Sequence, residues 1–206
     1  MSKVEIDRIV DNMGMIFGKI DVERPPYDVV ARGGDFEVRS YPRITIAKVV
    51  ADGDGHDNGM FRILAKYIGV FGTALNAEGT KMAMTAPVLS SSKAQAEMKP
   101  TILSSKGGAM AFVLPKSFSA ATAPVPTDER IKVEDVAARH VAVHTFSGLA
   151  TESSAAKKAA MLQDSLEKAG YTIKDTGYEL ARYNPPFTLP FLRTNEIWFS
   201  VEIKDE

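Results

Sequence analysis

The order of predicted elements repeats once along this chain of 206 residues. Apolar periodicity places a strand, a helix and two further strands in the first copy, over 36–50, 58–70, 81–90 and 109–114. The same order returns in the second copy, over 132–146, 152–169, 178–184 and 195–203. Two β-α-β-β units in series predict a duplicated α+β fold with antiparallel sheets and one helix in each half, the pseudo-repeats covering about 36–114 and 132–203.

Outside the predicted strands and helices of the two copies lie a short N-terminal region and two loops. Residues 1–26 are expected to form an amphipathic helix, which Arg24-Pro25-Pro26 breaks, and a linker. The apolar positions of the helix are Ile6, Ile9, Val10, Met13, Ile16 and Phe17. The remaining residues, 27–206, are then one domain. Segments rich in Ser, Ala, Pro and Gly predict exposed loops over 91–108 and 115–130.

Composition excludes several classes of function. A net charge of −1 gives no basic surface for nucleic acid or for an anionic membrane, and one short helix before Tyr27 does not suffice for a helix-turn-helix. No run reaches the roughly 18 apolar residues that span a bilayer. Without cysteine the chain has neither disulfides nor thiolate ligands. We expect a soluble cytoplasmic protein, or an organellar one if a transit peptide has been removed.

The two predicted helices differ in the width of their apolar faces. The helix over 152–169 carries one narrow stripe, with Thr151 or Ser153 at its start and Gly170 after its end; the stripe consists of Ala155, Ala159, Leu162, Leu166 and Ala169. The helix over 58–70 is apolar around well over half of its circumference, through Met60, Phe61, Ile63, Leu64, Ala65, Tyr67, Ile68 and Val70. Such a helix is either entirely core, or one of its flanks faces a further partner. Arg62 and Lys66 share its polar face, either as solvated cations or as a rim that meets carboxylates.

The run from Ala181 to Phe199 contains a loop that is both stiff and apolar. Pro185, Pro186 and Pro190 prevent a helix or a central strand there, because proline lacks the backbone donor. The large apolar side chains within it are those of Phe187, Leu189, Phe191 and Leu192. A loop of this kind is a suitable wall for a flat hydrophobic ligand.

Three runs resemble the SOUL haem-binding protein family in sequence and in order. They are Tyr27–Pro42, Lys81–Val88 and Ala181–Phe199, and the resemblance extends from about Tyr27 to Val201. It implies a distorted antiparallel β-barrel flanked by two helices. It also implies a non-enzymatic carrier or buffer that holds haem b or another protoporphyrin-type tetrapyrrole between the first helix and the 185–192 loop.

The resemblance also carries individual residues onto this chain. Those on the helix that match the family's haem-contacting positions are Met60, Phe61, Leu64, Ala65 and Lys66. On the loop, the corresponding wall is formed by Phe187, Leu189, Phe191 and Leu192. The family's propionate-binding arginine falls near Asn58 here, and Arg62 is the substitute that we expect.

Histidine, methionine and tyrosine are the remaining candidates for an iron ligand. His56 lies in a glycine-rich loop just before the first helix, where it is either a plain loop residue or an axial ligand. His140 and His144 fall on one face of a predicted strand, ~13 Å apart at the usual rise, which is too far for one metal ion. We expect both to be surface or core residues of that strand.

An enzymatic alternative rests on Glu196 and Tyr183. They fall on neighbouring predicted strands, and a paired carboxylate and phenol could act as acid and base in a small-molecule hydrolase of the related effector-binding-domain type. The simpler interpretation is that Glu196 forms an ion pair with Arg182 or Arg193 at the end of a strand.

Overall fold

The computed structural model describes residues 18–51, 57–91, 108–174 and 177–203. The predicted N-terminal helix over 6–17 and His56 therefore lie outside the described residues. The described elements of the first half are β1 (Asp28–Arg32), β2 (Glu37–Tyr41), β3 (Ile44–Val50), α2 (Asp57–Ile68), β4 (Val88–Ser91) and β5 (Ala109–Val113). Those of the second half are β6 (Ile131–Val136), β7 (Arg139–Phe146), α3 (Glu152–Lys168), β8 (Thr172–Ile173), β9 (Glu179–Arg182), the 3-10 turn η2 (Pro190–Leu192) and β10 (Asn195–Glu202).

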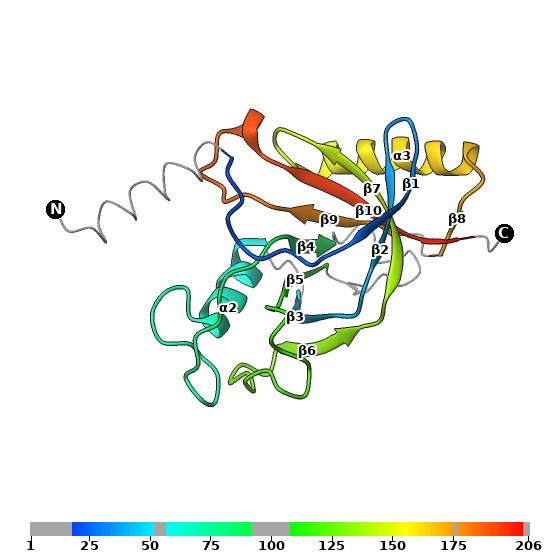
Figure 1. The fold of residues 1–206 in the computed structure, drawn as a ribbon. Coiled ribbons are helices and arrows are strands. Elements are labelled where there is room, and N and C mark those ends of the chain that lie inside the picture. Colours follow the sequence, from blue (N-terminus) through cyan, green and yellow to red (C-terminus); the bar gives the residue numbers. More distant parts are fainter. Residues whose placement is uncertain (1–17, 52–56, 92–107, 175–176, 204–206) are drawn as a thin grey trace.

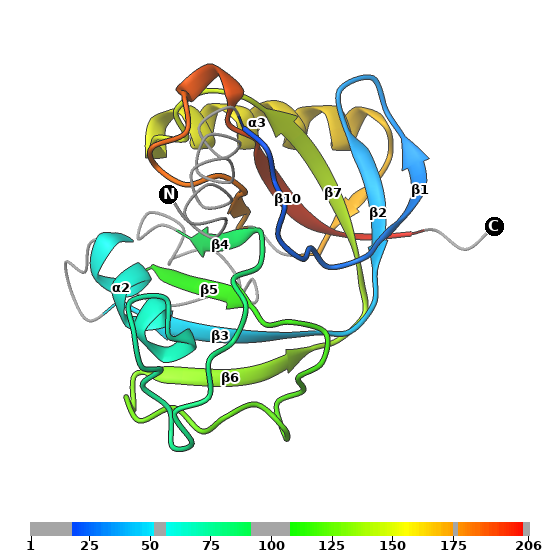
Figure 2. The ribbon, with the colours of Figure 1, turned by 60° about the vertical axis from the view of Figure 1, so that its left-hand side comes forward.

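The ten strands of the described residues belong to one curled antiparallel sheet (Figures 1 and 2). Its order is β1-β2-β7-β10-β9-β4-β5-β3-β6, and β8 adds to the far end of β10. The order is symmetric about the β9–β4 pair, where Leu89 lies opposite Ala181. On one side of that pair the order is β4-β5-β3, and on the other it is β9-β10-β7. The predicted α+β fold with a duplicated β-α-β-β unit is confirmed, because β3-α2-β4-β5 and β7-α3-β9-β10 take equivalent places.

Two of the predicted strands are wrong in their extent, because each is divided between the two halves of the sheet. The strand predicted over 36–50 breaks at Pro42-Arg43, so that β2 pairs with β7 while β3 pairs with β5 and β6. The strand predicted over 132–146 breaks at Ala137-Ala138 into β6 and β7. These two breaks let the same segments serve both halves of the curled sheet.

Other predicted boundaries also need correction. The strand predicted over 81–90 begins only at Val88, because the stretch before it contains Pro87 and bonds to other segments instead of a sheet neighbour. The edge strand β1 and the two-residue strand β8 were not predicted; β1 is largely exposed and so lacks a clear apolar alternation. Of the expected exposed loops, 92–107 lies outside the described residues, and the other includes the buried Pro124.

The two helices cover the outer face of the sheet, one over each half (Figure 2). Helix α2 packs on β3 and β5, whereas α3 packs on β7, β8 and β10. The inner, concave face carries its own core, which includes Tyr41, Ile46, Leu89, Val143 and Trp198. Successive residues of a strand alternate between these layers, so β10 sends Ile197 towards α3 and Trp198 to the inner face.

Local chemistry explains where each helix begins and ends. The Thr151 hydroxyl accepts the Ser154 N–H at 3.2 Å and caps α3, and Gly170 follows with φ +78°, as its position in the sequence predicts. The predicted stripe of α3 is buried except for Ala169, which is the exposed C-cap. Helix α2 ends at Ile68, two residues before the predicted end at Val70, because Gly69 follows with φ +84°; a side chain there would also crowd Ala74 and Lys81.

The segment 18–27 crosses the open side of the curled sheet before β1 begins (Figure 1). Its backbone is held where the Glu23 carbonyl accepts the Ala86 N–H at 2.9 Å, beside an isolated bridge between Glu23 and Thr85. The Tyr27 ring lies 5.3 Å from that of Tyr41. In the described part of the chain, neither helix has the length and apolar character needed to span a bilayer.

Candidate functional site

The 185–192 loop is held firmly by polar contacts along its length. The Arg193 side chain turns back on it, with Nε donating to the Thr188 carbonyl at 2.8 Å and Nη2 to the Pro186 carbonyl at 2.5 Å. The Pro190 carbonyl accepts the Gly148 N–H at 2.9 Å, and Thr188 is buried. The backbone therefore has a defined course although prolines deprive it of several donors.

The apolar side chains of this loop point outward. Phe187 is 56% exposed and Phe191 is 69% exposed, while Leu189 is just over a third exposed and Leu192 is half-buried. Leu149, which follows the Gly148 that bonds to the loop, is exposed as well. Large apolar side chains gathered on one ordered loop form the kind of surface that contacts a ligand or a partner.

The predicted residues of α2 divide into a buried set and an exposed set. Met60, Leu64 and Ala65 are buried in the core between α2 and the outer face of β3 and β5. Phe61 is half-buried, with its ring edge-on to Phe112 at 5.3 Å. The inner face of α2 is therefore protein core, which is the simpler of the two interpretations that its sequence allows.

The two cations of α2, Arg62 and Lys66, are exposed. Lys66 lies on the side of the helix that faces the connector after β5. There a hydrogen bond from Arg130, together with the charge of Lys66, lowers the pKa of the Asp128 carboxyl. Tyr67 is on this side too, where its hydroxyl donates to the Pro124 carbonyl at 2.7 Å and burial raises its pKa to about 12.

The two predicted walls of the tetrapyrrole site, α2 and the 185–192 loop, lie on the same side of the molecule, but each packs against a different part of the protein. In Figures 1 and 2 the loop lies next to the start of α3, and α2 lies on the other half of the sheet, with β4 and β9 between them. Gly148 and Arg193 donate hydrogen bonds to the loop and Gly18 lies against Leu192, whereas α2 rests on β3 and β5.

A second cluster lies inside the curled sheet around Glu196 of β10, whose side chain is buried. One carboxylate oxygen accepts hydrogen bonds from Arg39 Nη1 at 3.0 Å and from Thr145 Oγ1 at 3.3 Å. The other oxygen accepts from Tyr183 Oη and from Trp198 Nε1, both at 2.7 Å. Four donors from four different chain segments thus surround one buried carboxylate.

Burial keeps the two tyrosines of the Glu196 cluster, Tyr41 and Tyr183, protonated. Burial, reinforced by the charge of Glu196, raises the pKa of Tyr183 far above its usual range, so the phenol remains a donor. Burial likewise raises the pKa of Tyr41, which accepts from Arg39 at 3.4 Å. Arg39 also bonds to Glu37 at 2.9 Å and lies 4.3 Å from the centre of the Tyr27 ring.

The predicted proximity of Tyr183 and Glu196 is confirmed by their 2.7 Å hydrogen bond, but the expected ion-pair partners are wrong. Arg182 donates to the Ser90 hydroxyl at 2.8 Å on the outer face of the sheet, and Arg193 serves the 185–192 loop. Arg39 takes their place from 157 residues away in sequence. The alternation of Glu196 and Trp198 along one strand was the available signal for their shared face.

The two described histidines belong to the outer face of β7, and both are half-buried. His144 has its Nδ1 2.8 Å from the Asp35 carbonyl oxygen, and its ring stacks on Phe146 at 6.4 Å between centroids. Since His56 lies outside the described residues, its role as an iron ligand stays a prediction.

Comparison with protein families and curated proteins gives consistent matches over most of the chain. A family model described as "SOUL heme-binding protein" matches residues 22–200. "Heme-binding protein 1" of Mus musculus is 29% identical over 192 residues, covering 90% of this chain and 97% of that protein. "Heme-binding protein 1" of Sus scrofa is 27% identical over 198 residues, with the same coverage.

Solved structures resemble this one in fold at low sequence identity. The C-terminal domain of EcmrR superposes with a TM-score of 0.54 at 12% identity, covering 85% of this chain and 98% of that one. The crystal structure of a hydrolase from Listeria innocua superposes with a TM-score of 0.52 at 13% identity, over 84% and 94% of the two chains. At such identities the likeness extends to the fold alone.

Proposed function

The chain belongs to the SOUL heme-binding protein family, and from that premise we propose that it binds haem or a related tetrapyrrole as a carrier or buffer, without turnover. The observation that carries the proposal is the ordered 185–192 loop, whose backbone is fixed by hydrogen bonds while Phe187 and Phe191 stand exposed. A soluble protein gains nothing in its own fold from holding two phenyl rings in water.

The burial of apolar surface is the proposed source of affinity. A macrocycle lying against the loop would cover a few hundred Å² of apolar surface, and at about 25 cal/mol per Å² this yields several kcal/mol before any bond to iron. The loop loses little entropy on binding because Arg193 and Gly148 already fix its backbone.

The helix α2 would contribute mainly through its exposed and half-buried residues. Arg62 and Lys66 are the proposed partners of the ligand carboxylates, and Phe61 is the proposed apolar contact on the helix. Met60, Leu64 and Ala65 would shape the site indirectly by fixing α2 on the sheet. If the cargo is haem, its iron can take an axial ligand, and His56 remains our candidate for that position.

A parallel titration with hemin and metal-free protoporphyrin tests the proposal, with absorbance and quenching of Trp198 fluorescence as readouts. We expect one-to-one saturation by both ligands, and weaker binding of both to Phe191→Ser. The matched control is Phe71→Ser, because Phe71 is 64% exposed but belongs to neither predicted wall. Saturation by hemin alone would show that an iron ligand, and not the burial of apolar surface, supplies the affinity, and His56→Ala would be the next variant. Binding of neither ligand would reject the proposal.

A hydrolase that uses Glu196 and Tyr183 has weaker support, because four donors already engage the carboxylate and Tyr183 is held as a donor. The discriminating variant is Glu196→Gln, assayed with p-nitrophenyl esters of short acids. We expect no turnover by either protein and an unchanged porphyrin affinity. Ester hydrolysis by the natural sequence that disappears in Glu196→Gln would favour the enzyme instead.

A further inference from the structure

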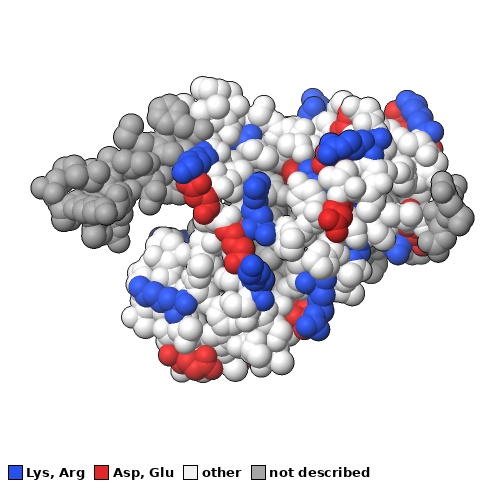
Figure 3. Space-filling model, viewed as in Figure 1, with Lys and Arg blue, Asp and Glu red and all other residues white. Residues whose placement is uncertain are grey.

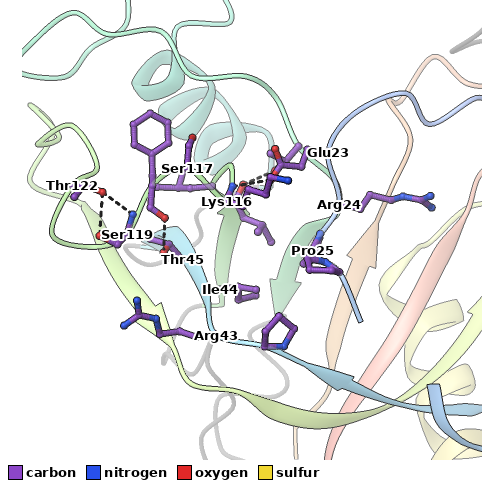
Figure 4. A pocket seen from close by; sticks show the side chains of 16 residues that line it. Glu23, Arg24, Pro25, Arg43, Ile44, Thr45, Lys116, Ser117, Ser119 and Thr122 are labelled. Atoms are coloured by element: carbon purple, nitrogen blue, oxygen red, sulfur yellow. Dashed lines mark hydrogen bonds between the residues drawn. The ribbon is translucent and has the colours of Figure 1, made fainter. Parts of the chain in front are cut away.

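A separate pocket of about 490 Å³ opens where β3 begins and β5 ends (Figure 4). Three segments supply nearly all of its lining: residues 23–26 before β1, residues 42–45 at the start of β3, and residues 113–119 with Thr122 after β5. It shares no residue with either predicted tetrapyrrole wall. Its volume is within the range of pockets that bind small molecules.

The first wall of this pocket is the N-terminal segment around Glu23, held from two sides. Its backbone carbonyl accepts the Ala86 N–H at 2.9 Å, and its side-chain Oε1 accepts the Lys116 backbone N–H at 2.7 Å. Pro25 and Pro26 follow and restrict the backbone of the same wall. The carboxylate of Glu23 is thus engaged in closing the pocket.

The opposite wall is a compact turn after β5. The Phe118 N–H donates to the Pro115 carbonyl at 2.9 Å, and the Ala123 N–H donates to the Ser119 carbonyl at 2.8 Å. Thr45 Oγ1 lies 3.1 Å from the Phe118 carbonyl oxygen and 2.7 Å from Asp135 Oδ1, which joins this turn to β3. Both walls are held by hydrogen bonds, so the pocket is already formed before any ligand enters.

The lining combines an apolar floor with a basic rim. Ile44, Val113 and Leu114 are buried and form the floor. The exposed cations Arg43 and Lys116 lie at the edge of the pocket together with the carboxylate of Glu23, whereas the Arg24 side chain points away from it (Figure 4). Arg43 is 3.6 Å from Asp135, an exposed pair of low energy, so its charge remains available to a ligand.

We propose that this pocket binds a small organic anion, namely a carboxylate attached to a compact apolar body, at a site independent of the tetrapyrrole. The apolar part would cover Ile44 and Val113, and the carboxylate would meet Lys116 and Arg43 at the rim. An apolar floor favours such a ligand over a fully hydrated anion such as inorganic phosphate, because only the former buries hydrocarbon. Figure 3 shows charged side chains gathered along the line where the N-terminal segment crosses this face.

The pocket can be tested by two-dimensional NMR of the uniformly ¹⁵N-labelled protein titrated with 2-naphthoate. We expect saturable shifts of the amide signals of Arg24, Thr45, Ser117 and Ser119. The neutral analogue 2-naphthalenemethanol should bind about tenfold more weakly, since it lacks the charge-assisted contacts, and inorganic phosphate should cause no saturable shift in this set. Shifts confined to other residues, or equal affinity for the neutral analogue, would overturn the proposal.

Variants at the rim sharpen the test without touching the core. Lys116→Gln with Arg43→Gln should weaken naphthoate binding about tenfold, and Lys116→Glu with Arg43→Glu should abolish it. The matched control, Lys157→Gln on α3, removes a positive charge from an exposed helical position and should change nothing. Saturating protoporphyrin should leave naphthoate binding intact. Displacement of naphthoate by protoporphyrin would show that both ligands use one site, and would contradict the proposal that the pocket is independent of the tetrapyrrole.

Discussion

Charged side chains are usually exposed and large apolar side chains are usually buried. The Glu196 cluster reverses the first tendency, and the 185–192 loop reverses the second. The cluster buries a carboxylate and a guanidinium inside the sheet, and the loop exposes phenyl rings in solvent. In the cluster, all four hydrogen bonds to Glu196 come from the protein itself. In the loop, hydrogen bonds hold the backbone, and the side chains of Phe187 and Phe191 face outward.

This difference separates a structural role from a binding role. A buried ion pair is expensive to break because removal of one partner leaves the other charged and desolvated. An exposed phenyl ring contributes little to folding, since its surface stays in water whether or not the chain is folded. We therefore expect substitutions in the cluster to change the free energy of unfolding, and substitutions in the loop to change ligand affinity.

The largest effect is expected for Glu196→Ala. This variant leaves Arg39 buried with Glu37 as its remaining carboxylate partner, so the free energy of unfolding should fall by about 3 kcal/mol. Urea unfolding followed by Trp198 fluorescence measures the change. Glu202→Ala, at an exposed position near the end of the same strand, is the control and should stay within about 0.5 kcal/mol. A loss below 1 kcal/mol for Glu196→Ala would remove the structural role of the cluster.

The opposite result, a loss of ligand affinity without a loss of stability, is expected for the double substitution Phe187→Ser with Phe191→Ser. Protoporphyrin affinity should fall about thirtyfold, which corresponds to about 2 kcal/mol of lost apolar contact. The midpoint of urea unfolding should remain that of the natural sequence, because both rings are exposed. If the variant instead unfolds more easily and binds protoporphyrin normally, the two rings stabilise the fold, and the loop has no separate role in binding.

A smaller loss of stability is expected for Tyr183→Phe. It deletes one 2.7 Å hydrogen bond to Glu196 while keeping the ring, so the cost should be about 1–2 kcal/mol with no change in porphyrin affinity. Tyr27→Phe provides the comparison, since Tyr27 is partly exposed and contributes its ring to the cluster. Equal losses of stability in the two variants would show that the hydrogen bond from Tyr183 to Glu196 does not contribute specifically to the free energy of unfolding.

The smallest effect is expected for Arg62→Gln with Lys66→Gln. Exposed charges on α2 contribute weakly, so hemin affinity should fall about threefold at low ionic strength, and the difference should vanish at high salt. Calorimetric titration at two salt concentrations measures it, with Lys157→Gln and Lys158→Gln on α3 as controls. A loss that persists at high salt would indicate direct, desolvated contacts with the ligand carboxylates.

Apolar periodicity was sufficient for the two helices and for the repeated order of strands. Thr151 and Gly170 even mark the limits of α3 correctly, because capping depends on residues within one turn. The division of 132–146 had no such signal, since the break falls at Ala137-Ala138. The reason for that break is the pairing of β6 with β3 and of β7 with β2, which involves partners distant in sequence.

The candidate site shows the same limit. The prolines and aromatic residues of 185–192 indicate a stiff apolar loop from the sequence, and the exposure of Phe187 and Phe191 gives that loop its free surface. The wide apolar arc of α2 allowed two interpretations, and only packing on β3 and β5 assigned Leu64 to the core. The basic pocket between Glu23 and Thr122 was not predicted at all, because its three lining segments meet only in the folded chain.

By itself, the sequence determined the α+β class, the duplicated order, the family and the stiffness of the loop, since each depends on residue type or on spacing within one segment. Tertiary structure alone decided that Arg39 is the partner of Glu196, which faces of α2 remain exposed, and where the pocket beside Glu23 and Lys116 opens. Long-range contacts set these features, and the chemistry of a buried charge depends on which distant groups the fold brings to it.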